Sequence, residues 1–467
     1  MSKQRLYCLD VGQGMCTYFE GYGDDDSVIA NALFDLGSTK TRRRAGRPTI
    51  QFLKRQIIAR SGDDEGYLDA VFLSHKDADH INLIRGLLEE LPKMKIGHVF
   101  HSGRYKWYAG KKTKNVLGEL GKRTENADTH VFNFAVGASS FPTGDPKDWH
   151  SIWGNETVNA YVIAVNTPMA DTKQGEDVDI AYKARDEPDG NLANSTSLGI
   201  YLKMFNVGAV IFGDATFSTF QFVNRHFLEH KVWLSSSFMI QAPHHGSRST
   251  TFGLKVSNAV ISEEAAQVVK TFASLTYGAT VIVSADTSHD HPSLDTINAF
   301  MKFADHRGPW WVDEPIQPNH LVSAYFDVPL SNTQGALNSN YTYQTNQNYY
   351  TTLYWGRESK KGNFSFPPAK ALTAPTAAFA EGMNWGYEVT AKSSVDQRNI
   401  RFIGFSSNRL PKSSRQLAEA FASARLANDV ASSSLAQATA PPPAPADGSA
   451  RAPARIQRNL RRLISRP

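Results

Sequence analysis

The stretch Ala70-Val71-Phe72-Leu73-Ser74-His75-Lys76-Asp77-Ala78-Asp79-His80 decides the fold. Its first four residues are apolar, as in a buried strand, and the rest hold two histidines and two aspartates, all residue types that bind divalent metal ions. Because the backbone turns where a strand ends and a helix begins, these four side chains can converge on one point. The stretch predicts a metal-binding loop after a buried strand. A charged loop in which Asp77 or Asp79 caps the helix is the plainer alternative.

Strand and helix patterns alternate on both sides of this loop, from residue 5 to about residue 304. The predicted strands cover residues 6–11, 15–20, 30–34, 70–73, 98–101, 160–165, 198–204, 209–212, 238–242 and 280–283. The predicted helices cover residues 50–59, 81–91, 219–229, 263–272 and 293–303. Hairpins followed by strand–helix alternation indicate an α/β fold of mixed sheets with helices outside.

Composition divides the chain into four parts. Residues 1–306 form the predicted main domain, with an insertion at about 104–146 and a polar loop at 168–191. Residues 307–408 are rich in aromatic residues and predict a β-rich extension packed on that domain. The remaining parts are a helix and Pro/Ala/Ser linker at 409–450 and a basic amphipathic tail at 451–467, which we expect to be disordered until it docks.

The charge of the chain is concentrated at its C-terminal end. Residues 409–467 hold ten Lys and Arg against three acids, a net +7, so the net +5 of the whole chain leaves −2 for the other 408 residues. The body therefore gives no argument from composition for nucleic acid binding. No apolar run approaches the roughly 18 residues of a membrane span, and the N-terminus lacks the apolar core of a secretory signal, so we expect a cytoplasmic protein without a membrane span.

Seven motifs occur in an order that resembles a known family. They are LDVGQG (9–14), LFDLGS (33–38), SHKDADH (74–80), NSTSLGIYL (194–202), IFGDA (211–215), APHHGS (242–247) and HP (291–292). The metal loop is similar to the HxHxDH signature of the metallo-β-lactamase superfamily, with Asp in place of the second His. The whole order resembles the hydrolase domain of the ComEC competence proteins and their freestanding soluble relatives. The resemblance spans residues 5 to 305 and implies a metallo-β-lactamase-like αββα sandwich.

The resemblance also implies a site for two divalent metal ions, zinc or manganese. His75 and Asp77 would hold one ion and Asp79 and His80 the other, while Asp214 matches the carboxylate that bridges both. His291 matches the last ligand of the family, and His289 is its rival. Aspartate at position 77 adds an oxygen ligand, which moves the preference from zinc towards manganese or magnesium.

Further residues receive supporting roles from the same resemblance. Asp35 matches an aspartate that orients the metal loop through hydrogen bonds, and Asp10 lies nearby in the opening turn, although both have a plain turn role as the alternative. Asn194 stands where many relatives carry a metal-binding histidine, which predicts weaker binding of one ion. His244 and His245 are candidate catalytic residues together with Asp79. One of the pair would complete the first metal shell or protonate a leaving oxygen, and a structural role for the other is equally open.

These residues predict a binuclear metal-dependent hydrolase, with a phosphodiesterase or nuclease as the first expectation. A bridged pair of ions lowers the pKa of a shared water towards about 7, giving a metal-bridged hydroxide, and can clamp a phosphate oxygen. The expected substrate is a nucleic acid or nucleotide, and the basic tail is expected to dock a partner protein. The alternatives are a hydrolase of a small ester, lactone or lactam, and a non-catalytic binding or effector protein with a degenerate metal site.

Overall fold

The computed structural model describes most of the chain up to residue 284 and short stretches beyond it. The described residues are 3–9, 11, 14–38, 46–63, 65–110, 113, 115–124, 131–135, 137–141, 148–167, 190–234, 236–256, 258–276, 280–284, 293, 295–296, 299–300, 321–325, 383–391 and 401–406. Asp10, His289, His291, the linker and the basic tail lie outside these residues, and what the sequence predicts for them stays a prediction.

The first sheet has eight strands. In spatial order they are β15 (Arg401–Ser406), β14 (Met383–Thr390), β1 (Lys3–Cys8), β2 (Thr17–Tyr22), β3 (Val28–Phe34), β4 (Tyr67–Leu73), β5 (Lys95–His101) and β6 (Val131–Asn133). The strands from β15 to β3 pair antiparallel, whereas β3, β4, β5 and β6 run parallel to one another. The parallel strands have their carboxyl ends on the same side of the sheet. The metal loop lies on that side, because it directly follows β4.

The second sheet has seven strands. In spatial order they are β13 (Leu321–Tyr325), β12 (Thr280–Ser284), β11 (Ser237–Gln241), β10 (Val207–Ile211), β9 (Gly199–Met204), β8 (Val158–Ala164) and β7 (Trp153–Gly154). The four strands from β10 to β13 run parallel, and those from β7 to β10 pair antiparallel. Both sheets are therefore mixed, as the sequence predicts. In each sheet, the parallel strands have their carboxyl ends on the same side.

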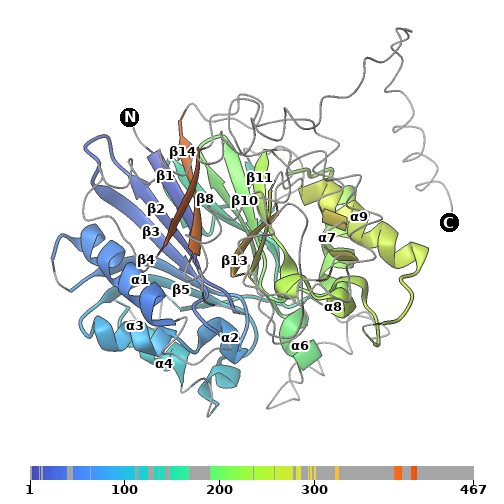
Figure 1. The fold of residues 1–467 in the computed structure, drawn as a ribbon, viewed down its shortest axis with the longest axis horizontal. Helices are drawn as coiled ribbons and strands as arrows, with labels where there is room; N and C mark the ends of the chain where they lie inside the picture. The colour runs from blue at the N-terminus through green and yellow to red at the C-terminus, as the bar shows by residue number, and fades with distance from the viewer. Residues whose placement is uncertain are drawn as a thin grey trace, which may run out of the picture.

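The sheets pack face to face and carry helices on their outer faces (Figure 1). One buried cluster joins residues of both sheets, among them Phe19, Phe72, Ile200 and Phe238. The outer face of the first sheet packs on α1 (Gly46–Ser61), α3 (Ile84–Glu90) and α4 (Val116–Gly121). That of the second packs on α7 (Phe217–His230), α8 (Arg248–Phe252) and α9 (Glu263–Thr276). The order of layers is helix, sheet, sheet, helix.

Local sequence explains where the outer helices begin and which face they bury. Thr216 opens α7 with a capping box, in which its side chain and that of Thr219 exchange hydrogen bonds with the backbone. In α9 the buried residues Ala265, Val269, Phe272 and Ala273 recur at the spacing of one helical face. Both predicted helices are confirmed, and each is a few residues longer than its apolar pattern.

Residues 104–146, predicted as an insertion, are built into the first sheet where they are described. They supply β6, the short 3₁₀ helix η1 (Tyr105–Ala109) and α4. Trp107, Leu117 and Leu120 are buried in the cluster between the sheet and its helices. The sequence did not predict α6 (Gly190–Ser195), because its six residues include only two apolar side chains.

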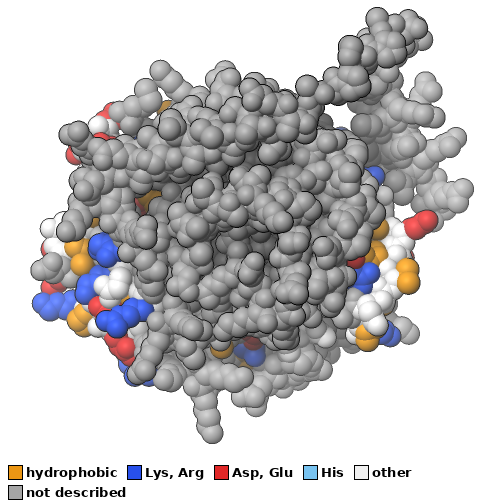
Figure 2. Space-filling view, in the orientation of Figure 1, with side chains coloured by type: hydrophobic (Ala, Val, Ile, Leu, Met, Phe, Trp, Pro, Cys, Tyr) orange, Lys and Arg blue, Asp and Glu red, His pale blue; other side chains and the backbone are white. Residues whose placement is uncertain are grey.

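Charged residues lie on the outer helices of the first sheet, and part of this flank is visible in Figure 2. Lys54 of α1 pairs with Glu90 of α3 at 3.1 Å, and within α3 Arg85 pairs with Glu89 at the same distance. α1 itself holds four basic residues and no acid, so these ion pairs do not balance its charge. Among the described helices, none is both long enough and apolar enough to cross a membrane.

Candidate metal centre

The predicted ligands gather where parallel strands of both sheets end. Asp35 follows β3, and the loop from His75 to His80 follows β4 and runs into α2 (Ala78–Ile81). Asp214 follows β10 of the second sheet. His244 and His245 lie in η3 (Pro243–Gly246), directly after β11. The two sheets thus contribute side chains to one site between their strand ends.

The aspartates of the metal loop are available for an ion rather than used as helix caps. Asp77 stands at the N-cap of α2, yet its side chain makes no capping hydrogen bond. Its Oδ2 lies 3.7 Å from His75 Nε2, and its Oδ1 lies 3.2 Å from Lys76 Nζ. The plainer alternative, in which Asp77 caps the helix, is therefore wrong for this residue. Lys76 therefore forms an ion pair with Asp77.

Asp214 lies between two groups of histidines. Its Oδ2 is 3.8 Å from His75 Nε2 and 3.6 Å from His244 Nε2. Its Oδ1 is 3.0 Å from His80 Nε2 and 3.5 Å from His245 Nε2. Each carboxylate oxygen thus faces a different pair of imidazoles. Asp79 belongs to the second group, since its Oδ2 lies 3.5 Å from His245 Nε2.

Three of these histidines are held from behind through Nδ1. His80 Nδ1 donates to Asp35 Oδ2 at 2.8 Å, and His245 Nδ1 donates to the carbonyl oxygen of Ser284 at 2.7 Å. Ser74 Oγ donates to Asp35 Oδ2 at 2.5 Å and so accepts from His75 Nδ1 at 3.0 Å. In the neutral form of each ring, these contacts leave Nε2 as the lone-pair nitrogen, directed at Asp214. Hydrogen bonds of this kind orient metal-binding histidines in general.

Backbone strain is concentrated in the same loops. Asp35, His244 and His245 have φ angles of 52°, 48° and 53°, a left-handed conformation that costs side-chain-bearing residues free energy. Two adjacent left-handed residues in η3 place both imidazoles beside Asp214. Strain of this kind is retained mainly where function requires it.

Burial and charge interactions act in opposite directions on the protonation of the cluster. Burial by itself would raise the pKa of Asp214, but His244, His80 and His245 hold that pKa well below its usual range. Burial would lower the pKa of His80 and of His245, but neighbouring carboxylates, Asp214 first, raise both. His244 differs, because burial lowers its pKa despite the attraction of Asp214. The neighbouring carboxylates thus favour the protonated form of His80 and His245.

The donor set fits divalent cations. His75 Nε2 is buried and has no hydrogen-bond partner within the described part of the chain, a costly state unless something else satisfies it. Two ligand atoms that share a tetrahedral ion lie roughly 3.4 Å apart, given metal–ligand distances of about 2.0–2.2 Å. Three of the four separations around Asp214, from 3.5 to 3.8 Å, are near that value and too long for hydrogen bonds. In each of two sets, the ligand atoms all lie within 4.8 Å of one another. One set is His75, His80 and Asp214, and the other is Asp79, His80 and His245.

The structure places most of the predicted residues at the site and adds others. Asn194 lies beside His244, with its Nδ2 3.4 Å from His244 Nδ1. Sequence reasoning missed Ser74 and the carbonyl of Ser284, because a serine beside a metal motif and a backbone oxygen leave no distinctive pattern. It also missed Asn82, whose amide exchanges hydrogen bonds with the backbone of Ser38 and so ties α2 to the loop after β3.

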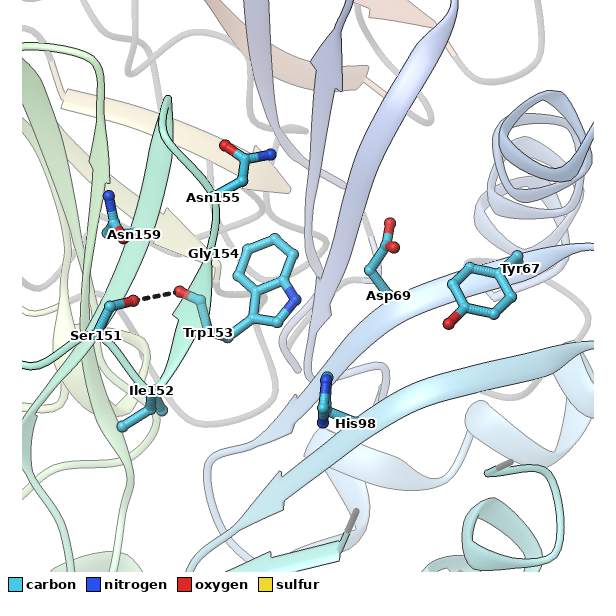
Figure 3. Close-up of a pocket in the computed structure, with 9 residues that line it drawn as sticks. All are labelled: Tyr67, Asp69, His98, Ser151, Ile152, Trp153, Gly154, Asn155 and Asn159. Carbon is cyan, nitrogen blue, oxygen red and sulfur yellow. Dashed lines mark hydrogen bonds between the residues drawn. The ribbon is translucent and has the colours of Figure 1, made fainter. Parts of the chain in front are cut away.

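A separate pocket of about 550 Å³ opens at the other end of β4, away from this site (Figure 3). Its lining includes Asp69, His98, Trp153 and Asn159, none of them in the ligand set. The Asp69 carboxylate is already neutralised by Arg60, which donates two hydrogen bonds at 3.0 and 3.1 Å. The chemistry of the candidate site therefore lies at the strand ends and not in this pocket.

Comparisons with known proteins give distant likenesses. No protein-family model and no curated protein matches the chain. Among solved structures it is similar to CmlA, a diiron β-hydroxylase from Streptomyces venezuelae, at 10% sequence identity and a TM-score of 0.31, over 65% of this chain and 51% of that one. It is also similar to Igni18, a metallo hydrolase from the archaeon Ignicoccus hospitalis, at 12% identity and a TM-score of 0.29, over 65% and 92%. The match spans about half of CmlA. These similarities are too distant to assign a function, so the chemistry of the site is inferred from its own residues.

Proposed function

We propose that this chain is a hydrolase that uses two divalent metal ions and cleaves a phosphodiester bond. The observation that carries the proposal is the placement of Asp214, whose Oδ2 faces His75 and His244 while its Oδ1 faces His80 and His245. A carboxylate shared in this way can hold two like charges side by side.

The residues divide into two ligand groups around that carboxylate. His75, Asp77 and His244 would hold the first ion with Asp214 Oδ2, and Asp79, His80 and His245 would hold the second with Oδ1. When bound, the ions supply a nucleophile at neutral pH by lowering the pKa of water, and they neutralise charge that builds on the substrate. Asp35 and Ser74 keep the proton on Nδ1 of His80 and His75, so that Nε2 of each ring can bind.

Two features favour a phosphodiester over a neutral ester. The order of seven motifs resembles the ComEC-type hydrolase domain, as set out above. Lys76 also lies beside the ligand loop, 3.2 Å from Asp77, with 23% of its side chain exposed. A cation at this position favours approach of an anionic substrate.

The test is hydrolysis by chelator-treated protein after addition of manganese, zinc or magnesium. We expect turnover of bis(4-nitrophenyl) phosphate, with manganese at least as effective as zinc, and loss of that turnover in Asp214→Ala. Asp63→Asn, in an exposed turn at the far end of β4, is the matched control and should keep the wild-type rate.

The same assay separates the alternatives. Turnover of 4-nitrophenyl acetate or a lactone without phosphodiester cleavage would show that the enzyme acts on a small ester or lactone and not on a phosphodiester. A protein that binds ions yet hydrolyses none of these substrates would point to a binding or effector role. Wild-type activity in Asp214→Ala would refute the assignment of the site.

A further inference from the structure

The structure assigns Asn194 as a positioning residue that holds His244 for the first metal ion, an inference that rests on the proposed metal centre. Asn194 comes from the last turn of α6, and His244 from η3 after β11. The two residues are 50 positions apart in sequence and meet at 3.4 Å between Asn194 Nδ2 and His244 Nδ1.

The other three histidines of the site provide the pattern. Behind His75, His80 and His245, Nδ1 meets a hydrogen-bond acceptor, respectively Ser74 Oγ, Asp35 Oδ2 and the carbonyl oxygen of Ser284. Behind His244, Nδ1 lies 3.4 Å from the amide nitrogen of Asn194. If that nitrogen donated to Nδ1, the ring proton would sit on Nε2, facing Asp214, and Nε2 would have no lone pair for an ion.

The burial of the amide favours the opposite orientation. Asn194 is only 7% exposed, and its Oδ1 is buried without a hydrogen-bond partner among the residues the structure describes. Exchanging the amide oxygen and nitrogen keeps the shape of the side chain, because the two atoms are nearly the same size. The exchange gives Oδ1 a donor, namely the Nδ1 hydrogen of His244, and turns Nδ2 towards the position in which Oδ1 found no donor. Nε2 then presents its lone pair 3.6 Å from Asp214 Oδ2, as His75 does at 3.8 Å.

This arrangement gives Asn194 a role that differs from the one its place in the motif order suggests. An amide binds metal ions poorly, so the sequence predicts a weakened first site. In the structure Asn194 holds the imidazole of His244, which lies within reach of the same carboxylate oxygen as His75. The first site thus keeps a second histidine, supplied from another loop and oriented by the asparagine.

The test is titration with Mn²⁺ by isothermal calorimetry, using Asn194→Leu, Asn194→Asp and His244→Ala in the full chain. Leucine preserves volume but cannot accept a hydrogen bond, so we expect the affinity for one of two ions to fall about 10- to 100-fold, with the other unchanged. Aspartate restores an acceptor and should keep both affinities within a few-fold of wild type. His244→Ala should weaken the same ion, and adding Asn194→Leu to it should cause no further loss.

Ser195→Ala is the matched control. Its hydroxyl is equally buried in α6 and donates to the carbonyl of Leu192, away from the ligands, so this variant should bind both ions normally. Wild-type affinity for both ions in Asn194→Leu would overturn the inference, and so would equal loss of both ions, which would mark a structural role. Wild-type protein that binds two ions but hydrolyses nothing would overturn the proposed function alone. Wild-type protein that binds no ion would overturn both.

Discussion

At the scale of single residues, the site is a balance between buried carboxylates and imidazoles. Asp214 is 4% exposed and His80 fully buried, so neither charge is compensated by water. The carboxylates raise the pKa of His80 and His245 although burial opposes this. The carboxylates that favour the protonated form of these rings are thus the ones that would neutralise bound divalent ions.

We expect binding of divalent ions at pH 7 to release protons, because His80 and His245 must lose theirs to become ligands. Because the carboxylates raise the pKa of both rings above its ordinary value, affinity should increase as the pH rises and the rings lose their protons. Calorimetry in two buffers of different ionisation enthalpy measures the number released. His245→Gln should release fewer protons than wild type, and binding without proton release would contradict the titration of the two rings.

The residues of this site divide into those the sequence could identify and those it could not. His75, Asp77, Asp79, His80 and Asp214 were predicted because they follow apolar strands and match a motif order. His244 and His245 were candidates as well, but their placement beside Asp214 was not predictable, because it depends on two left-handed residues in succession, a conformation that is uncommon for residues with a side chain. Hydrogen bonds to Ser74 and Ser284 depend on tertiary contacts and have no counterpart in local sequence.

At the scale of elements, the metal loop is fixed by backbone packing as well as by its ligands. Gly37, in the loop after β3, lies against the backbone of Asp79 and His80 so closely that a methyl group there would overlap it. Leu36 N–H donates to the carbonyl of His80 at 2.7 Å, which ties the same two segments together. The close contact requires glycine at position 37 for steric reasons.

Gly37→Ala should therefore displace α2 and lower the free energy of unfolding by about 1–3 kcal/mol, the usual cost of overpacking. The affinity for divalent ions should fall in parallel, because Asp79 and His80 move. Urea denaturation and metal titration measure the two effects. Gly121→Ala in α4, where the added methyl group would lie 3.8 Å from Val131 Cγ2, is the control and should be neutral or slightly stabilising. Equal behaviour of the two variants would contradict the steric argument.

A buried carboxyl in β2 makes the first sheet sensitive to pH. Glu20 is fully buried, and its Oε2 accepts hydrogen bonds from Tyr22 at 2.5 Å and Gln56 at 3.1 Å. Burial raises the pKa of Glu20 to about 7, against the lowering effects of Tyr22 and Arg5. Between pH 4 and 7 this carboxyl then loses its proton in the unfolded state before it does so in the folded one. The folded state binds more protons in that window, so its stability falls as pH rises.

Relative to Glu20→Gln, the wild type should lose about 3 kcal/mol of unfolding free energy between pH 4 and pH 8, since each pKa unit corresponds to about 1.4 kcal/mol. Urea denaturation of both proteins across this range measures the difference. Glu263→Gln, at an exposed position at the start of α9, is the control and should follow the wild-type curve. Curves for Glu20→Gln and wild type that stay parallel would show that Glu20 ionises normally.

At the scale of the whole molecule, the sheets are completed by strands from beyond residue 306. β14 pairs with β1 over six residues, and β13 pairs with β12. Glu388 of β14 forms an ion pair with Arg5 at 2.8 Å, and Val389 is buried in the cluster between the sheets. Sequence patterns predicted a β-rich segment in this region but not its partners, because pairing across more than 370 residues leaves no local signal.

Two truncations test how far the folded unit extends. A chain ending at residue 306 should be destabilised or insoluble, because it exposes the hydrogen-bonding edges of β1 and β12 and loses Val389 from the core. A chain ending at residue 430 keeps β13, β14 and β15 and lacks only the linker and basic tail. We expect it to retain the wild-type melting temperature and turnover of a small phosphodiester.

Melting temperature, solubility and turnover of the two truncations and the full chain distinguish the possibilities. If the chain ending at 306 melts like wild type and keeps its activity, the boundary predicted from composition is right and the added strands are accessory. Loss of small-substrate turnover in the chain ending at 430 would instead assign the tail to the catalytic unit. We expect neither result, because the described strands from 321 to 406 continue both sheets through backbone pairing, whereas unpaired edges of this length favour aggregation.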